Sequence, residues 1–103
     1  MKPSEVLLKA KSAIETYGWV QGRSGTPEVG FCMAGAIHYT LQSEWRAWLD
    51  IESDSLEEKA RGYLYKATNS TVVSTYNDDL LRSKDEVLKA FDIAVELAKR
   101  DGQ

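Results

Sequence analysis

The chain has only one cysteine and one histidine among its 103 residues, and this scarcity excludes several kinds of site. A single cysteine cannot form an internal disulfide, and one cysteine with one histidine cannot supply the ligands of a zinc site. The longest apolar run, residues 29–41, is too short to span a bilayer and contains His38. We therefore expect a cytoplasmic protein without a metal, a cofactor or a membrane anchor.

A large excess of charge is also missing, because 13 Lys and Arg residues stand against 16 Asp and Glu residues, for a formal net charge of −3. Nucleic-acid binding requires Lys and Arg gathered on one face, so nucleic acid is not expected as a partner. The content of 43% hydrophobic and 28% charged residues is that of an ordinary globular protein. The length predicts one domain, residues 1–103.

Hydrophobic residues spaced three and four apart predict helices along most of the chain. The first helix is expected to run from an N-cap at Ser4 to Gly18, a residue that commonly ends helices. Two later helices open with Ser-x-x-Glu capping boxes, at residues 55–58 and 83–86. The β-branched residues of segment 70–80 favour an extended conformation, but no partner strand is evident, so its conformation is left open.

The segment 29–41 is apolar on nearly every face, which is typical of a buried helix. Thr26 is a candidate cap for it, with Pro27 in its first turn. Gly35 would let a neighbouring segment approach the helix closely. The sequence therefore predicts a compact all-α bundle of four to five helices around a central helix at about residues 29–41.

No catalytic set is predicted. The glycine spacing of residues 25–30 matches a phosphate-binding loop, but Phe31 and Cys32 stand where that loop needs Lys and Ser or Thr. Cys32 lies near a helix start, as thiol nucleophiles do, yet His38 would lie about 9 Å further along the helix and about 120° around it. We expect Cys32 to be a buried, unreactive side chain.

Four short elements resemble those of an uncharacterised family of small bacterial and bacteriophage proteins, known as a domain of unknown function. They are GWVQG at 18–22, FCMAGAI at 31–37, YNDD at 76–79 and VLKAFDIAVELA at 87–98. The chain departs from the family pattern in having Tyr76 in place of Trp and a short loop between the first two elements. The resemblance implies no activity. The matching positions are Trp19, Gln21, Gly22, Cys32, Gly35, Ala36, Asn77, Asp78, Asp92 and Ala94.

Two functions fit these observations. The first is a non-enzymatic accessory protein that acts by protein–protein contact, such as a phage-encoded modulator of a host system. Trp45 and Trp48 would form a partner face, with burial in the core as the alternative. The second is a binding protein for a small nucleotide-like ligand, held by two turns, with candidate residues Trp19, Gln21, Gly22, Arg23, Cys32, Tyr76, Asn77 and Asp78. Assembly with further copies is left open.

The same two turns have a structural interpretation. Trp19–Gly22 and Tyr76–Asp78 each place an aromatic residue beside amide or acid groups, a composition suited to closing the end of a core. We expect the turns to pack together beside the start of the central helix. Gln21, Asn77 and Asp78 would then bond mainly to main-chain groups.

Overall fold

The computed structural model describes residues 1–43, 52–70 and 72–103, in which the chain forms five helices and one short hairpin. The predicted all-α bundle is confirmed. Trp45 and Trp48 lie outside the described residues. The elements in order are α1 (Pro3–Tyr17), β1 (Gly25–Thr26), β2 (Gly30–Phe31), α2 (Met33–Ser43), α3 (Glu52–Thr68), α4 (Val73–Asn77) and α5 (Lys84–Arg100).

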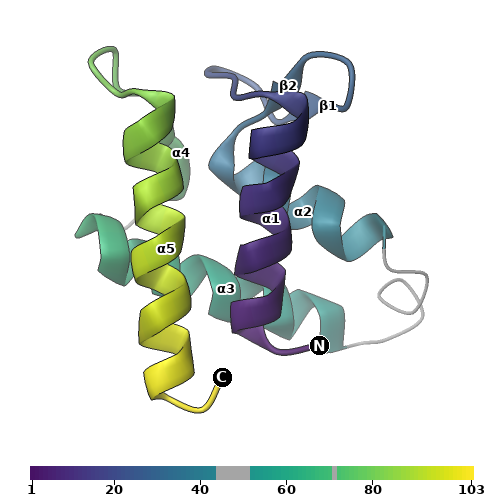
Figure 1. Cartoon of the computed structure of the whole chain (residues 1–103), viewed down its shortest axis with the longest axis vertical. Coiled ribbons are helices and arrows are strands. Elements are labelled where there is room, and N and C mark those ends of the chain that lie inside the picture. The colour runs from purple at the N-terminus through teal and green to yellow at the C-terminus, as the bar shows by residue number, and fades with distance from the viewer. Residues whose placement is uncertain (44–51, 71) are drawn as a thin grey trace.

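The long helices α1 and α5 lie side by side and run in opposite directions, and α2 and α3 cross behind them (Figure 1). The two ends of the described chain meet at the foot of this pair. There the main-chain N–H and the hydroxyl of Ser4 both donate to the main-chain oxygen of Gln103, each at 3.2 Å. Lys11 and Asp92 join the two helices by an ion pair of 2.7 Å.

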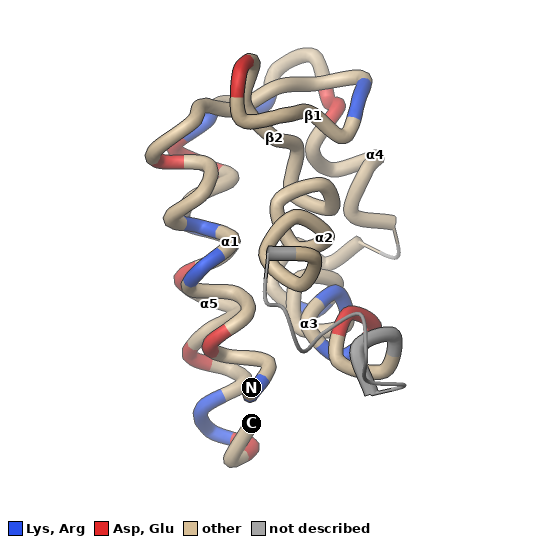
Figure 2. The backbone as a smooth tube through the Cα atoms, turned by 90° about the vertical axis from the view of Figure 1, so that its right-hand side faces the viewer, with Lys and Arg blue, Asp and Glu red and all other residues tan. Residues whose placement is uncertain are grey.

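Helix α2 is the apolar centre of the bundle. It contacts α1, α3, α4 and β2, and its eleven residues include no Lys, Arg, Asp or Glu (Figure 2). Helix α2 is not buried on every side, because the side chain of His38 is exposed. The core gathers side chains from all five helices, and its largest fully buried members are Phe91, Leu7, Ile14, Met33, Ile37, Leu64, Val6, Val87 and Asn77.

Two predicted helix starts are wrong by a few residues. Helix α1 begins at Pro3, which is favourable at a first helical position, so Ser4 is inside the helix and its hydroxyl serves the chain end instead. Helix α3 begins at Glu52, so the expected capping box at residues 55–58 falls within the helix. The capping box at Ser83 is confirmed, because the N–H of Glu86 donates to the Ser83 hydroxyl at 3.2 Å.

The predicted start of the central helix is also wrong, because residues 25–31 form the antiparallel hairpin β1–β2 and α2 begins at Met33. The glycines of this segment explain the error. Gly25 and Gly30 have φ of 95° and 101°, a region that favours glycine and interrupts a helix. The close approach expected at Gly35 is present, since a Cβ added there would lie 2.0 Å from the main-chain oxygen of Ser24.

Segment 70–80, left open by the sequence, contains the short helix α4. The described β-branched residues Val72, Val73 and Thr75 do not form a strand, because the chain here packs a single turn of helix against α2 and α3. Val73 and Asn77 are the buried residues of that turn. Helix α4 ends where the polar stretch of Asn77 and Asp78 begins, so it carries these two side chains to the start of α2.

Candidate functional site

The chain reverses after α1 and runs beside the hairpin. The N–H of Phe31 donates to the main-chain oxygen of Gly18 at 2.9 Å, and the N–H of Val20 donates to the main-chain oxygen of Phe31 at 3.2 Å. Gly18 has φ 108°, as expected for a glycine that ends a helix. This pairing places the turn of residues 19–22 at the same end of the molecule as the start of α2 (Figure 1).

A second turn, residues 76–79, meets the first, and Asn77 is the centre of the contact. Its side chain is 0% exposed. Its Oδ1 accepts from Trp19 Nε1 at 2.7 Å and from the N–H of Met33 at 3.1 Å. Its Nδ2 donates to the main-chain oxygen of Val20 and to Asp78 Oδ1, each at 3.0 Å. We call the contact between residues 19–22 and 76–79, together with the N–H of Met33, the Asn77 junction.

The amide of Asn77 has no hydrogen-bonding capacity left over. A carboxamide offers two lone pairs on its oxygen and two N–H groups on its nitrogen, and each of these four positions has a partner within the chain. The two donors at Oδ1 and the two acceptors at Nδ2 fix the orientation of the amide. A fully satisfied buried network of this kind makes a local structure rigid and specific.

Gln21 and Asp78 complete the Asn77 junction at its exposed side. Gln21 Nε2 donates to the main-chain oxygens of Asn77 and Asp79, at 2.9 and 2.8 Å. The N–H of Gly22 donates to Asp78 Oδ1 at 2.9 Å. The structure therefore brings the two predicted turns together, and most of the bonds between them involve main-chain atoms.

The Asn77 junction also satisfies the beginning of α2. The first N–H groups of a helix have no partner within it. Here the N–H of Met33 donates to Asn77 Oδ1, and the N–H of Gly35 donates to Cys32 Sγ at 3.2 Å. Cys32 is buried, as predicted from its apolar neighbours, and its sulfur acts as a helix cap.

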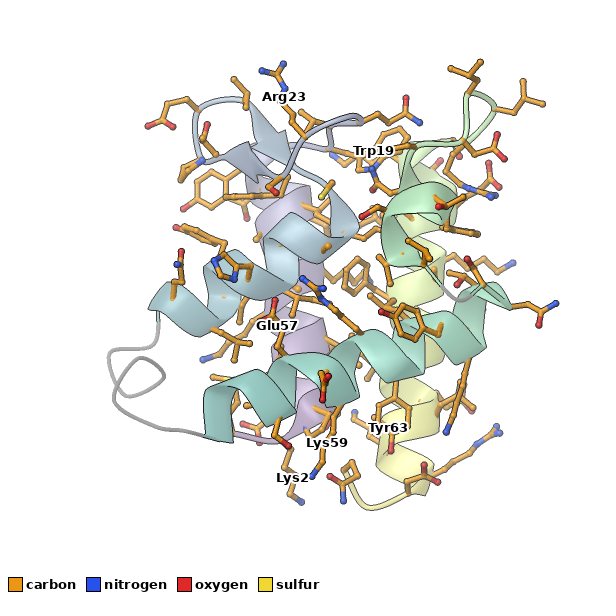
Figure 3. All side chains as sticks on the ribbon, turned by 180° about the vertical axis from the view of Figure 1, so that it is seen from behind. Lys2, Trp19, Arg23, Glu57, Lys59 and Tyr63 are labelled. Atoms are coloured by element: carbon orange, nitrogen blue, oxygen red, sulfur yellow. The ribbon has the colours of Figure 1, made fainter. Side chains whose placement is uncertain are left out.

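Two of the predicted site residues, Arg23 and Tyr76, are not among the partners of the Asn77 amide. Arg23 is exposed and points outward, away from Trp19 (Figure 3). Tyr76 is half-buried beneath Arg82, whose guanidinium carbon lies 3.6 Å from the centre of the Tyr76 ring. Tyr76 thus connects the Asn77 junction to the segment that follows it.

That next segment contains two residues that the sequence analysis missed. Leu80 and Leu81 follow the Asn77 junction directly, and their side chains are 94% and 91% exposed. Their loop projects beyond the helices at the end of the molecule where the hairpin also lies (Figure 1). The signal in the sequence is a pair of leucines between Asp79 and Arg82, ahead of the Ser83 capping box that opens the next helix.

The single histidine and the single cysteine have different surroundings on helix α2. His38 is exposed and its Nδ1 lies 3.6 Å from Glu57 Oε1, while Cys32 is buried at the start of the same helix. Among residues 1–43, 52–70 and 72–103, no group of three or more His, Cys, Asp or Glu side chains could hold a metal ion. No helix within those ranges has the length and apolar character needed to cross a membrane.

The chain belongs to a family of unknown function, DUF6197, whose family model matches residues 1–97. This match includes both turns of the Asn77 junction and the Leu80–Leu81 pair. No curated protein and no solved structure matches the chain.

Proposed function

We propose that the chain is a small accessory protein that acts by contact with another protein. The observation that supports this most is the exposure of Leu80 and Leu81, at 94% and 91%, in adjacent positions of one loop. Single exposed leucines are ordinary, but apolar side chains gathered on a surface mark sites of interaction. More specifically, we propose a cytoplasmic protein encoded by a bacterium or a bacteriophage. A protein encoded by a bacteriophage would act on a system of its host.

The free energy gained by burying two leucines is smaller than the binding free energy of a micromolar complex. Burying a leucine side chain contributes about 1.5–3 kcal/mol, whereas micromolar affinity corresponds to about 8 kcal/mol. The pair therefore anchors a contact and does not supply it alone. Trp45 and Trp48 stay in the proposal as a further contact face, on the basis of their spacing in the sequence.

The alternative of a small-ligand site in the two turns has less support. Asn77 was one of its principal candidates, but the four hydrogen-bonding positions of that amide are occupied within the chain. The N–H of Gly22, which could have approached an anion, donates to the Asp78 carboxylate instead. We therefore assign the Asn77 junction a structural role and the leucine pair the contact role.

Site-specific photo-crosslinking in cells of the source organism tests the proposal. A benzophenone amino acid at position 80 should crosslink to a protein that the same group at position 8 does not reach. Leu8 is the matched control, an exposed leucine on α1. The purified crosslinked protein should bind the wild-type chain and lose binding to Leu80→Ser/Leu81→Ser, which should keep the wild-type melting temperature. Equal crosslinking from both positions, or full binding by the double variant, would contradict the proposed function.

A further inference from the structure

The two exposed leucines lie on a turn that is closed by hydrogen bonds to Asp79. The main-chain oxygen of Asp79 accepts from the N–H of Arg82 at 2.9 Å and from Gln21 Nε2 at 2.8 Å. Asp79 Oδ1 accepts from the N–H of Leu81 at 2.9 Å. These bonds close the turn over residues 79–82, which we call the leucine turn, and connect it to the Asn77 junction.

Arg82 fixes the other end of the leucine turn. Its guanidinium lies over the Tyr76 ring, and its Nε donates to the main-chain oxygen of Tyr76 at 3.0 Å. Its Nη1 donates to Glu86 Oε2 at 2.8 Å, and its Nη2 lies 3.8 Å from Asp79 Oδ2. Only 20% of the Arg82 side chain is exposed, so this cation is engaged within the chain.

The order of the turn matters for binding. An apolar loop that must be ordered by its partner loses much of the binding free energy in that step. Here Gln21 and Arg82 donate to main-chain oxygens that precede the leucines in the chain, and the Asp79 carboxylate accepts from the N–H of Leu81, before any partner arrives. The leucine turn is therefore a preformed projection suited to insertion into a pocket.

The segment that contains the leucine turn is acidic. Residues 78–86 include four carboxylates, Asp78, Asp79, Asp85 and Glu86, against two cations, Arg82 and Lys84, which leaves a formal charge of −2. The Asp79 side chain is 51% exposed and that of Glu86 is 47% exposed, compared with 20% for Arg82. We call these four carboxylates the acidic rim. Electrostatic potentials on the two sides of a protein interface are complementary, so the acidic rim favours a partner surface with positive charge.

The acidic rim also distinguishes between occupants of this surface. Two copies of the chain meeting leucine turn to leucine turn would bring their acidic rims together, because a two-fold contact pairs each surface with itself. A bilayer containing anionic lipids repels the same carboxylates. A protein pocket with Lys or Arg at its edge meets neither penalty.

We propose that the leucine turn binds a partner protein that offers an apolar pocket with a rim of Lys or Arg. The inference rests on the proposed contact function and specifies the chemistry of the partner. The leucines fill the pocket, while Asp79 and the neighbouring carboxylates pair with the basic rim and select it over neutral or acidic apolar surfaces.

A peptide library displayed on phage tests this chemistry with the purified full chain as bait. Selection should use the wild-type chain with prior removal of peptides that bind Leu80→Ser/Leu81→Ser. We expect the enriched peptides to combine apolar residues with Lys or Arg. A synthetic copy should bind the wild-type chain more than about a hundredfold more tightly than the double variant.

Charge variants separate the rim from the leucines. Asp79→Asn keeps an oxygen acceptor for the N–H of Leu81, and together with Asp85→Asn it removes two carboxylates from the rim. This pair should weaken binding of the synthetic peptide by roughly three- to tenfold and reduce its salt dependence. Glu58→Gln, an exposed position on α3, should leave binding unchanged.

Other outcomes would overturn the inference. Enriched peptides rich in Asp or Glu, or peptide binding insensitive to the rim variants, would show that the partner chemistry is wrong while the crosslinking result at position 80 still stands. Cosedimentation of the chain with phosphatidylcholine–phosphatidylglycerol vesicles, or a dimer in sedimentation equilibrium, would identify a different occupant if either were lost in Leu80→Ser/Leu81→Ser. Failure of position-80 crosslinking would instead contradict the proposed function itself.

Discussion

Trp19 Nε1 lies 2.7 Å from Asn77 Oδ1, and this bond joins two turns that are 58 residues apart in the chain. The same oxygen accepts from the N–H of Met33, so one buried amide holds the segment after α1, the start of α2 and the end of α4. The Asn77 junction therefore connects three segments of the chain. Gln21 also connects it to the leucine turn, by donating to the main-chain oxygen of Asp79.

The indole of Trp19 contributes both packing and a hydrogen bond, and two variants separate these effects. Trp19→Phe keeps an aromatic ring but removes the donor to Asn77 Oδ1, which should lower the free energy of unfolding by about 1–3 kcal/mol. Trp19→Ala also removes the packing against the core and should cost about 3–5 kcal/mol. Urea unfolding measures both, and equal losses in the two variants would show that the ring packing contributes nothing.

Asn77→Asp should be more damaging than its similar shape suggests. An ionised carboxylate cannot donate to the Val20 oxygen or to Asp78, and it places a buried charge beside the Asp78 carboxylate. We expect a loss of about 3–5 kcal/mol at neutral pH, with a smaller difference from wild type in acid, where the new acid is protonated and can donate. Asn69→Asp, at an exposed position, is the control. A difference between Asn77→Asp and wild type that does not change with pH would contradict the hydrogen-bond assignment.

We expect the protonation of Glu86 in acid to make the protein less stable. Hydrogen bonds from Arg82 and from the N–H of Ser83 lower the pKa of Glu86 below its ordinary value of 4.5. A lowered pKa in the folded state means that the stabilisation is present above the ordinary value and is lost as the pH falls through the folded value. Glu86→Gln should therefore lower the melting temperature at about pH 7, and the difference from wild type should shrink towards about pH 3. A constant difference across that range would show that the carboxylate charge has no part in it.

Cys32 should react slowly with thiol reagents in the native protein. Its side chain is buried, and its sulfur accepts the N–H of Gly35 at the start of α2. Labelling at neutral pH should be at least about a hundredfold slower than in denaturant, because reaction requires local opening. Mass spectrometry measures the rate directly. Labelling of the native chain as fast as the unfolded chain would show that the thiol is accessible.

The pairing of the two turns could be predicted from the sequence, but the leucine turn could not. Trp19, Gln21, Asn77 and Asp78 are residue types that satisfy main-chain groups in turns, so their composition indicated their role before any contact was known. The exposure of Leu80 and Leu81 depends on where Gln21 and Arg82 hold the turn, which is a tertiary effect. Leucine by itself indicates burial as readily as contact.

The first residue of α2 could not be predicted from the sequence either. Residues 29–41 have the apolar character of a helix, yet Val29 is 45% exposed in the hairpin and the helix begins at Met33. Hydrophobic spacing alone cannot distinguish a helix that starts at residue 29 from one that starts at Met33. The helix begins where Cys32 Sγ and Asn77 Oδ1 accept its first N–H groups, and Asn77 is 44 residues further along the chain than Met33.

The most direct test of the account compares stability and binding in Asn77→Ala. We predict that this variant loses about 1–3 kcal/mol of unfolding free energy in urea, because Trp19 and Met33 lose an acceptor and the Val20 oxygen loses a donor. Leu80→Ser/Leu81→Ser should show the opposite pattern, with an unchanged urea midpoint and lost binding of the crosslinked partner. An Asn77→Ala variant with the wild-type urea midpoint and no binding of that partner would contradict the account, because the Asn77 junction would then be the functional site.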